Sequence, residues 1–148
     1  MLLGDKALAE GWKPEIDAQE TGKKVLIIGA GPSGLSCAWH LRRLGHSVEI
    51  REAGPMAGGM MHFGIPAYRL PRDVLDQEIQ RILQTGIHLK LNCKVEDVQE
   101  AKTTGEFDAV FLAIGAHLAT RINIPARDSS TILDAVSYLS SVEKGNAP

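Results

Sequence analysis

The sequence predicts an α/β fold with a mainly parallel sheet, and three observations support this prediction. Residues 24–28 form a continuous apolar run, which is typical of a strand buried on both faces of a sheet. The apolar positions that follow recur with helical spacing, and a short strand-like segment comes next. A strand, a helix and a strand in this order form a right-handed crossover, which makes the two strands parallel.

The amino-terminal half of the chain supplies this unit. Residues 1–22 are interpreted as a short helix or arm followed by a linker that contains proline and acidic residues. Residues 33–44 carry the apolar stripe of a helix, and Gly45 is a typical stop signal. Residues 46–50, HSVEI, predict the second strand, which leads into Arg51 and Glu52.

The remaining elements follow from weaker patterns. Residues 53–70 predict a long loop rich in Gly, Met and Pro, and loops of this length in compact domains are often functional. A proline in the first turn and a buried stripe predict a helix over 71–85. Residues 87–92 alternate, as in a strand near a sheet edge, and 107–115 predict a second fully apolar strand. We also expect a polar segment at 96–106, a short extended piece at 122–125 and a final helix at 131–142.

The composition fits one soluble α/β domain and excludes several classes of function. The chain has 148 residues, of which 44% are hydrophobic, and a formal net charge of −2. This charge provides no strong attraction to nucleic acid or to an anionic membrane, and the 5% of aromatic residues disfavours a base-stacking surface. Cys37 and Cys93 form no CxxC or Cys/His cluster, so we expect no metal site. No run approaches the ~20 apolar residues of a membrane span, and we expect a cytoplasmic protein.

The stretch GAGPSG, residues 29–34, is the main functional motif. It matches G-x-G-x-x-G between a buried strand and a helix, the context in which this pattern binds a dinucleotide. Gly29 would form the tight turn, Gly31 would let a pyrophosphate approach the backbone, and Gly34 would let the helix pack close to the strand. Pro32 costs little at a helix start, where the N–H groups and the positive end of the dipole face the phosphates.

Glu52 is expected to bind a ribose. It ends the second strand, eighteen residues after Gly34, where a carboxylate accepts hydrogen bonds from the ribose hydroxyls. Such a carboxylate repels a 2′-phosphate and therefore favours FAD or NAD over NADP, although the neighbouring Arg51 could serve a 2′-phosphate. The motif alone does not decide between FAD and a nicotinamide. Its glycines could also serve only packing and turning.

The loop after Glu52 bears on the identity of the cofactor. Gly58 and Gly59 follow soon after the ribose-binding position, where the backbone would approach a diphosphate or a ribityl chain closely. Arg69 could reach a phosphate or the flavin end, or could be a solvated loop charge. His62 could act as an acid, but a structural role is preferred for this and the other histidines, and we name no catalytic residue.

Three segments carry a resemblance to a known family over about residues 4–142. They are KKVLIIGAGPSGLSCAWHLRRLGHSVEIREA, GGMMHFGIPAYRLP and FDAVFLAIGA. With them the chain resembles the small (beta) subunit of NADPH-dependent glutamate synthase, the matching domain of dihydropyrimidine dehydrogenase and related NADPH-dependent ferredoxin oxidoreductases. The resemblance implies a Rossmann-type FAD-binding domain beside an NADPH domain. It also implies that NADPH reduces FAD, which passes electrons singly to iron–sulfur clusters.

The resemblance also implies a set of cofactor-binding residues. Ala30 to Gly34, including Pro32 and Ser33, would hold the pyrophosphate, and Glu52 would hold the adenosine ribose. The further contacts would come from Gly59 and Met60, which would line the FAD, from Arg69, from the backbone of Val95 near the adenine, and from Gly115 at a strand end.

The chain departs from the family pattern in three ways. Its 148 residues contain no second glycine motif for NADPH, no returning segment that completes the FAD domain, and no cysteine-rich iron–sulfur module. We therefore expect an arm at 1–22, an FAD domain at 23–142 that is incomplete relative to the family, and a linker at 143–148. The chain would then be part of a longer enzyme, binding FAD only.

The expected partners are FAD and the NADPH-binding and iron–sulfur domains or subunits of the full enzyme. The flavin side that the missing segment would cover favours self-association of the fragment. Two alternatives stay open: a non-catalytic nucleotide-binding module that docks on a partner, and a nicotinamide-binding Rossmann domain.

Overall fold

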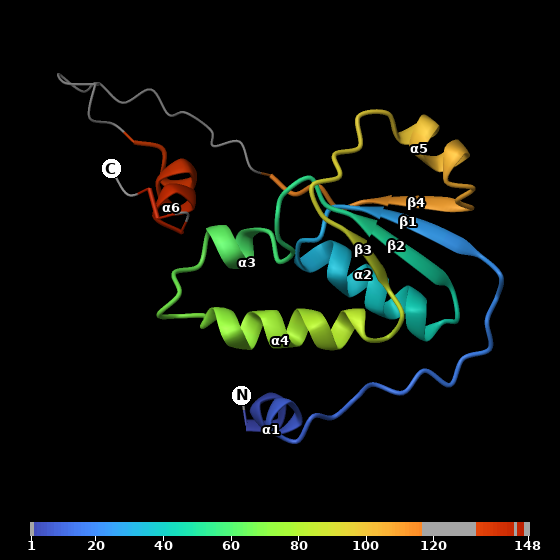
Figure 1. Cartoon of the computed structure of the whole chain (residues 1–148), viewed down its shortest axis with the longest axis horizontal. Coiled ribbons are helices and arrows are strands. Elements are labelled where there is room, and N and C mark those ends of the chain that lie inside the picture. Colours follow the sequence, from blue (N-terminus) through green and yellow to red (C-terminus); the bar gives the residue numbers. More distant parts are fainter. Residues whose placement is uncertain (1, 117–132, 144, 147–148) are drawn as a thin grey trace.

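The computed structural model is built on a parallel sheet with helices on both of its faces (Figure 1). It describes residues 2–116, 133–143 and 145–146. The described strands are β1 (Lys24–Ile28), β2 (Ser47–Arg51), β3 (His88–Lys90) and β4 (Ala109–Leu112). They lie in the order β3-β2-β1-β4, and every neighbouring pair is parallel. The predicted α/β class and parallel sheet are confirmed.

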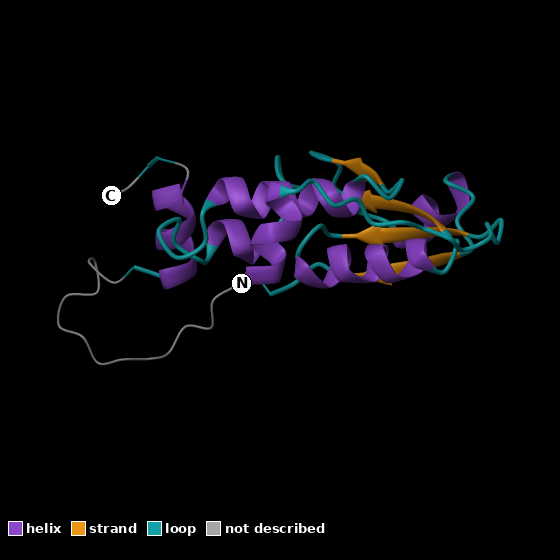
Figure 2. Ribbon diagram, turned by 90° about the horizontal axis from the view of Figure 1, so that it is seen from below, coloured by secondary structure: helices purple, strands orange, loops and turns teal. Residues whose placement is uncertain are grey.

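The described helices cover both faces of the sheet, and some of them lie farther from it. They are α1 (Leu2–Ala9), α2 (Pro32–Arg43), α3 (Met60–Phe63), α4 (Arg72–Leu83), α5 (Val98–Thr104) and α6 (Ala135–Glu143). Helices α2 and α4 lie on one side of the sheet and α5 lies on the other (Figures 1 and 2). Helix α6 lies at the end of the molecule away from the sheet, where it contacts α3.

Strand β1 is the centre of the hydrophobic core because its side chains are buried on both faces. Ile27 packs with residues of α2 and α4, whereas Leu26 and Ile28 pack with Ala101 and Phe107 on the α5 side. Leu26 and Ile27 have no exposed surface. The continuous apolar run at 24–28 therefore reflects burial on both faces, as the sequence predicted.

Most predicted elements are present with shifted ends. The helix expected at 33–44 begins at Pro32, the one expected at 71–85 covers Arg72–Leu83, and the strand expected at 46–50 covers Ser47–Arg51. The strand expected at 87–92 is only His88–Lys90, and it lies at the sheet edge as predicted. Residues 122–125 and the first two residues of the helix expected at 131–142 lie outside the described residues.

Two expectations were wrong, those for the loop at 53–70 and for the strand at 107–115. The loop contains the single turn of α3. The segment at 96–106 is polar as expected, but it contains α5, which was not predicted. The signal for α5 was the acidic pair Asp97 and Glu100, because the Asp97 side chain accepts the Glu100 N–H at 2.9 Å as a helix cap. The strand expected at 107–115 is limited to β4, and it is not fully buried, since Leu112 is 58% exposed.

Candidate functional site

The largest concave region that includes the glycine motif lies at the carboxyl ends of the strands. The chain runs from β1 to β2 and β3 on one side and then crosses to β4 on the other side. Open parallel sheets bind ligands at this reversal of strand order. A cavity of about 650 Å³ is located there, lined by residues that follow β1, β2 and β4 and by the start of α3.

Two glycines of the motif are explained by the protein itself. Gly29 has a φ of +106°, which side chains disfavour, and a Cβ there would overlap the carbonyl group of Ala113. A Cβ on Gly34 would overlap the carbonyl oxygen of Gly29. These two glycines therefore allow the turn and the close approach of α2 to β1. Packing and turning alone account for both.

Gly31 is different from these two. Its φ of −75° and ψ of −176° are open to any residue, so the backbone conformation does not require glycine. A Cβ added there would meet no atom of the described chain within 4 Å, so packing does not require glycine either. Gly31 lines the cavity. A side chain at this position would fill space that lies outside the protein and inside the cavity.

The carboxylate of Glu52 is held at the cavity by two backbone groups. Its Oε2 accepts the N–H of Ala30 at 2.7 Å, and its Oε1 accepts the N–H of Gly54 at 2.8 Å. A carboxylate offers about four lone-pair positions, so two bonds leave it able to accept more. Glu52 also lines the cavity. Its orientation is therefore set before any ligand arrives.

Arg51 also lines the cavity, and one of the five N–H donors of its guanidinium is paired outside it. Its Nε donates to Oε1 of Glu49 at 2.8 Å, and its guanidinium carbon lies 5.5 Å from the centre of the Phe107 ring. Lys90 approaches the other carboxylate oxygen of Glu49 at 3.2 Å. Burial raises the pKa of the Glu49 carboxyl, but the hydrogen bonds from Arg51 and Lys90 outweigh it and leave the pKa below its ordinary value.

The opposite wall of the cavity is formed by the segment around α3. Gly59 precedes α3 with a φ of +53°, and a Cβ there would lie 3.0 Å from the Cα of Gly31. The segment therefore packs directly against the β1–α2 turn. Met60 and Phe63 of α3 line the cavity next to it.

The structure brings most of the predicted cofactor-binding residues to one cavity. Those that line it are Gly29, Gly31, Pro32, Ser33, Glu52, Gly59, Met60, Val95 and Gly115. Two others lie behind the lining: Ala30 is fully buried and donates its N–H to Glu52, and Gly34 is buried in α2. Arg69 does not line the cavity. It is exposed, in a turn where the N–H groups of Arg69 and Leu70 donate to the carbonyl oxygen of Pro66.

Several lining residues were not anticipated from the sequence. They include Met56, Phe63, Cys93, Lys94, Leu112, Ala113 and Ile114. The apolar run that ends at Gly115 was the available signal for the last three, because the carboxyl ends of neighbouring parallel strands meet at one edge. Cys93 is half-buried at the cavity.

His62 does not face the cavity. It is 6% exposed, and its Nε2 lies 3.1 Å from Oδ1 of Asp76 on α4. A second hollow, of about 600 Å³, lies between α2 and α4 and is lined mainly by apolar side chains such as Trp39 and Val74. It includes only Pro32 from the glycine motif.

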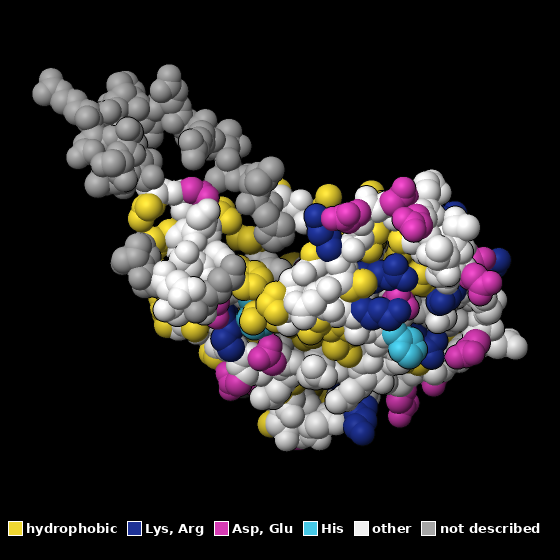
Figure 3. Space-filling model, turned by 45° about the horizontal axis from the view of Figure 1, so that its top comes forward, with side chains coloured by type: hydrophobic (Ala, Val, Ile, Leu, Met, Phe, Trp, Pro, Cys, Tyr) yellow, Lys and Arg dark blue, Asp and Glu magenta, His cyan; other side chains and the backbone are white. Residues whose placement is uncertain are grey.

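Surface charge, metal ligands and membrane spans were the remaining features to consider in the described part of the chain. Lys and Arg side chains gather over the sheet on the face in Figure 3, while apolar side chains extend toward α6. Among the described residues, no three His, Cys, Asp or Glu side chains group as metal ligands would. In the same part of the chain, every helix is too short or too polar to cross a bilayer.

Known proteins similar to this chain are oxidoreductases. The family model described as "Pyridine nucleotide-disulphide oxidoreductase" matches residues 23–147. The chain is 43% identical over 135 residues to the NADP(+)-dependent formate dehydrogenase subunit beta of Moorella thermoacetica, covering 86% of this chain and 19% of that protein. It is 38% identical over 139 residues to the glutamate synthase [NADPH] small chain of Escherichia coli, covering 93% and 29% respectively.

The relatives are longer than this chain. It spans about a fifth to a third of the length of the first curated relatives that it matches. Among solved structures, Mycobacterium tuberculosis FprA in complex with NADPH aligns with a TM-score of 0.68 and 23% identity, over 80% of this chain and 28% of that one. This likeness supports the fold. The resemblance to glutamate synthase small subunits that the sequence motifs suggested is confirmed.

Proposed function

Since the chain belongs to the pyridine nucleotide-disulphide oxidoreductase family, we propose that the cavity at the carboxyl ends of β1 and β4 binds FAD. The pyrophosphate would lie over Gly31 at the start of α2, where the first N–H groups of the helix have no partner within it. The adenosine ribose would lie on Glu52. Val95 would face the adenine, and Gly59, Met60 and Gly115 would lie along the rest of the cofactor.

The observation that carries this proposal is the glycine at position 31. The described part of the chain gives no internal reason for it, because its φ and ψ are ordinary and a Cβ would meet none of the described atoms within 4 Å. A ligand whose phosphates lie against this backbone supplies the reason. The interpretation in which the glycines serve only packing and turning accounts for Gly29 and Gly34 and leaves Gly31 unexplained.

The engagement of Arg51 supports a nucleotide with a free 2′-hydroxyl. An arginine that serves a 2′-phosphate must present its guanidinium to the cavity, but Arg51 is paired with Glu49 at 2.8 Å. The fixed carboxylate of Glu52 also repels a phosphate at that position. We therefore propose FAD at this site in preference to NADP.

The chain would act as the FAD-binding part of a longer glutamate-synthase-like enzyme. Bound flavin would supply the ability to accept a hydride and to release single electrons. In the longer enzyme it would then carry electrons from NADPH to iron–sulfur centres. The residues of this chain would bind and orient the cofactor: Gly31 by close backbone approach and Glu52 by accepting hydrogen bonds. Arg69 would contribute only after its loop moves, since it does not line the cavity.

Titration of the purified chain with dinucleotides tests the proposal. We expect saturable binding of FAD, seen as a change in the flavin absorption spectrum. Binding of FMN should be much weaker, because FMN lacks the AMP moiety and with it the full pyrophosphate and the adenosine ribose that Gly31 and Glu52 would recognise. The matched control is Gly31→Val, which should keep the far-ultraviolet circular dichroism and lose FAD. Tighter binding of NAD or NADPH than of FAD would favour a nicotinamide domain, and no binding of any dinucleotide would contradict the proposal.

A further inference from the structure

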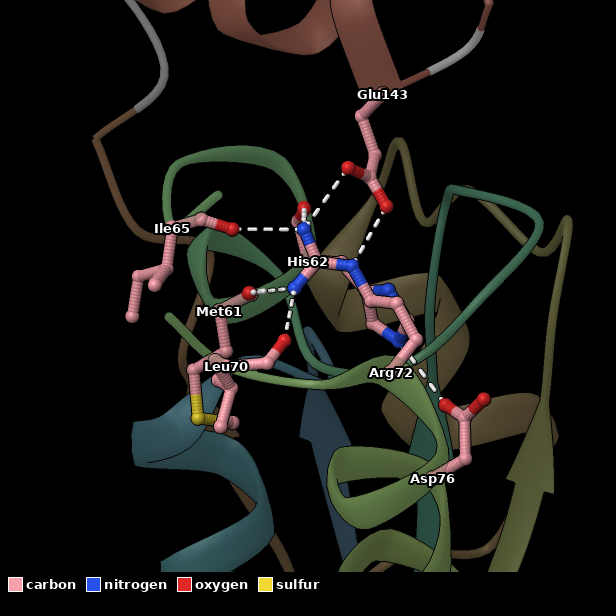
Figure 4. A network of polar contacts seen from close by, with 7 residues as sticks. All are labelled: Met61, His62, Ile65, Leu70, Arg72, Asp76 and Glu143. Carbon is pink, nitrogen blue, oxygen red and sulfur yellow. Dashed lines mark hydrogen bonds and ion pairs between the residues drawn. The ribbon is translucent and has the colours of Figure 1, made fainter. Parts of the chain in front are cut away.

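Arg72, at the start of α4, joins the segment that precedes it, from Met61 to Leu70, to the distant helix α6 (Figure 4). Its Nε and Nη2 donate to the two carboxylate oxygens of Glu143 on α6 at 2.6 and 2.9 Å. Its two terminal nitrogens also donate to four backbone carbonyls at 2.7–3.2 Å. These carbonyls belong to Met61, His62, Ile65 and Leu70.

The carbonyls need such a donor because α3 is a single turn. A helix leaves its last carbonyls without partners inside the helix. In α3 the carbonyl of Met60 accepts the N–H of the following Gly64 at 2.8 Å. Arg72 supplies N–H groups to the carbonyls of Met61 and His62. The planar guanidinium presents five donors in a fixed fork, which an ammonium group cannot reproduce.

A second contact ties the same turn to α4. The ring of His62 is buried, and its Nε2 lies 3.1 Å from Oδ1 of Asp76, one turn after Arg72. A Cβ on Gly58 would lie 2.6 Å from the His62 ring, so the chain entering the turn also packs on this ring. The face of the turn toward α4 is therefore held by side chains from outside it.

The other face of the turn is the wall of the cavity. Met60 and Phe63 line it, and Gly59 packs against Gly31. We infer that Arg72 is a positioning residue that keeps α3 closed over the dinucleotide, although it does not touch the cavity itself. This inference rests on the proposed function, and it adds a residue from outside the glycine motif and the ribose site.

Glu143 completes the arrangement from α6. Its carboxylate accepts two hydrogen bonds from the guanidinium of Arg72 and so orients this group toward the carbonyls. The hydrogen bond from Arg72 holds the pKa of Glu143 below its ordinary value despite the opposing effect of desolvation. Glu143 therefore stays ionised across the neutral range. The contact gives α6 a direct connection to the cavity wall through Arg72.

Two substitutions at Arg72 test the inference. Arg72→Gln removes the charge and the fork, whereas Arg72→Lys keeps the charge beside Glu143 but cannot join four carbonyls. We expect the Kd for FAD to rise about tenfold in Arg72→Gln and nearly as much in Arg72→Lys, in line with the loss of charge-assisted hydrogen bonds. The matched control is Arg81→Gln on the same helix, where the nearest carboxylate is a single Glu78 oxygen at 3.6 Å.

Two further measurements separate positioning from a general loss of stability. Amide hydrogen exchange of residues 61–64 should speed up in both Arg72 variants, while exchange in β1 and β2 stays unchanged. The visible circular dichroism of the flavin at saturating FAD should change in these variants and not in Arg81→Gln. If Arg72→Gln fails to fold, Glu143→Gln is the milder variant, with an expected rise in Kd of about threefold.

The outcomes are distinct. Suppose that the wild-type chain binds FAD and that the Arg72 variants show the same Kd, exchange rate and flavin spectrum as the wild type. This result overturns the present inference and leaves the proposed function standing. Full recovery of FAD affinity in Arg72→Lys also overturns it, because charge would then suffice. Absence of FAD binding by the wild-type chain overturns the proposed function, and the positioning role is lost with it.

Discussion

The two walls of the cavity are held in place in different ways. The β1–α2 turn is shaped by its own backbone: Gly29 has a positive φ, and Gly34 lets the helix approach the Gly29 carbonyl. The facing segment around α3 is shaped by side chains from elsewhere, chiefly Arg72 and Asp76 of α4. The first wall is thus encoded in six neighbouring residues. The second depends on contacts that form only when the fold is complete.

The largest effect is expected at Gly34, where the first wall depends on backbone contact. In Gly34→Ala the added Cβ would overlap the carbonyl oxygen of Gly29, so α2 must move away from β1. Overpacking of this kind costs about 3 kcal/mol, and here the neighbour is backbone that cannot rotate away. Urea unfolding of the chain measures it. A variant as stable as the wild type would mean that the turn adjusts easily, and the contrast between the walls would disappear.

The next effect is expected at Gly31, which lies three residues earlier on the same wall. Gly31→Val should change the urea midpoint little, because its Cβ meets no protein atom and its φ and ψ suit other residues. It should weaken FAD binding by about 2 kcal/mol, since the side chain occupies the space of the phosphate. Equilibrium dialysis with FAD measures this. Wild-type affinity in this variant would show that the pyrophosphate does not bind against residue 31.

The same contrast explains what could be predicted from the sequence. The motif at 29–34 and the buried strand before it were readable because their geometry follows from local residue types. Helix α3 was missed because a single turn has too few residues for periodicity, and its carbonyls are bonded by Arg72 from the next element. The sequence also could not predict that Arg69 lies outside the cavity lining, because its position depends on the conformation of the loop after α3.

The limited burial of β4 has a related cause. Its residues are all apolar, which predicted a strand buried on both faces. In the structure β4 pairs with β1, with Ala109 opposite Val25. Within the described residues β1 is its only partner strand. Apolar composition indicates what a strand can bury, and the burial itself depends on the neighbours present.

A smaller effect is expected at Glu52, which is a side chain held by backbone. Glu52→Ala should weaken FAD binding by about 1–2 kcal/mol, the scale of hydrogen bonds from ribose hydroxyls to a charged acceptor. It should also release the N–H groups of Ala30 and Gly54, which the carboxylate now accepts at 2.7 and 2.8 Å. Parallel titrations with FAD and FMN check the assignment. An unchanged FAD affinity would exclude Glu52 from the site.

The smallest effect is expected at Glu49 on β2. Its carboxylate pairs with Arg51, which lines the cavity, and with Lys90. Glu49→Gln breaks its ion pairs with Arg51 and Lys90. We expect this to cost about 1 kcal/mol of stability near neutral pH, because both cations stay partly exposed although Glu49 itself is buried. Since the folded-state pKa of Glu49 is lowered, its contribution is complete above the unfolded-state pKa. It is lost as the pH falls through the folded-state value.

The difference in unfolding free energy between the wild type and Glu49→Gln should therefore be constant from pH 8 to about pH 5 and shrink below about pH 4. Urea unfolding across this range measures it. The substitution also frees the Arg51 guanidinium at the cavity, so the affinity for NADP should rise relative to that for NAD. If the NADP affinity stays unchanged while the stability falls, Arg51 does not control the 2′-position. The preference for a free 2′-hydroxyl would then rest on Glu52, whose carboxylate the backbone alone holds in place.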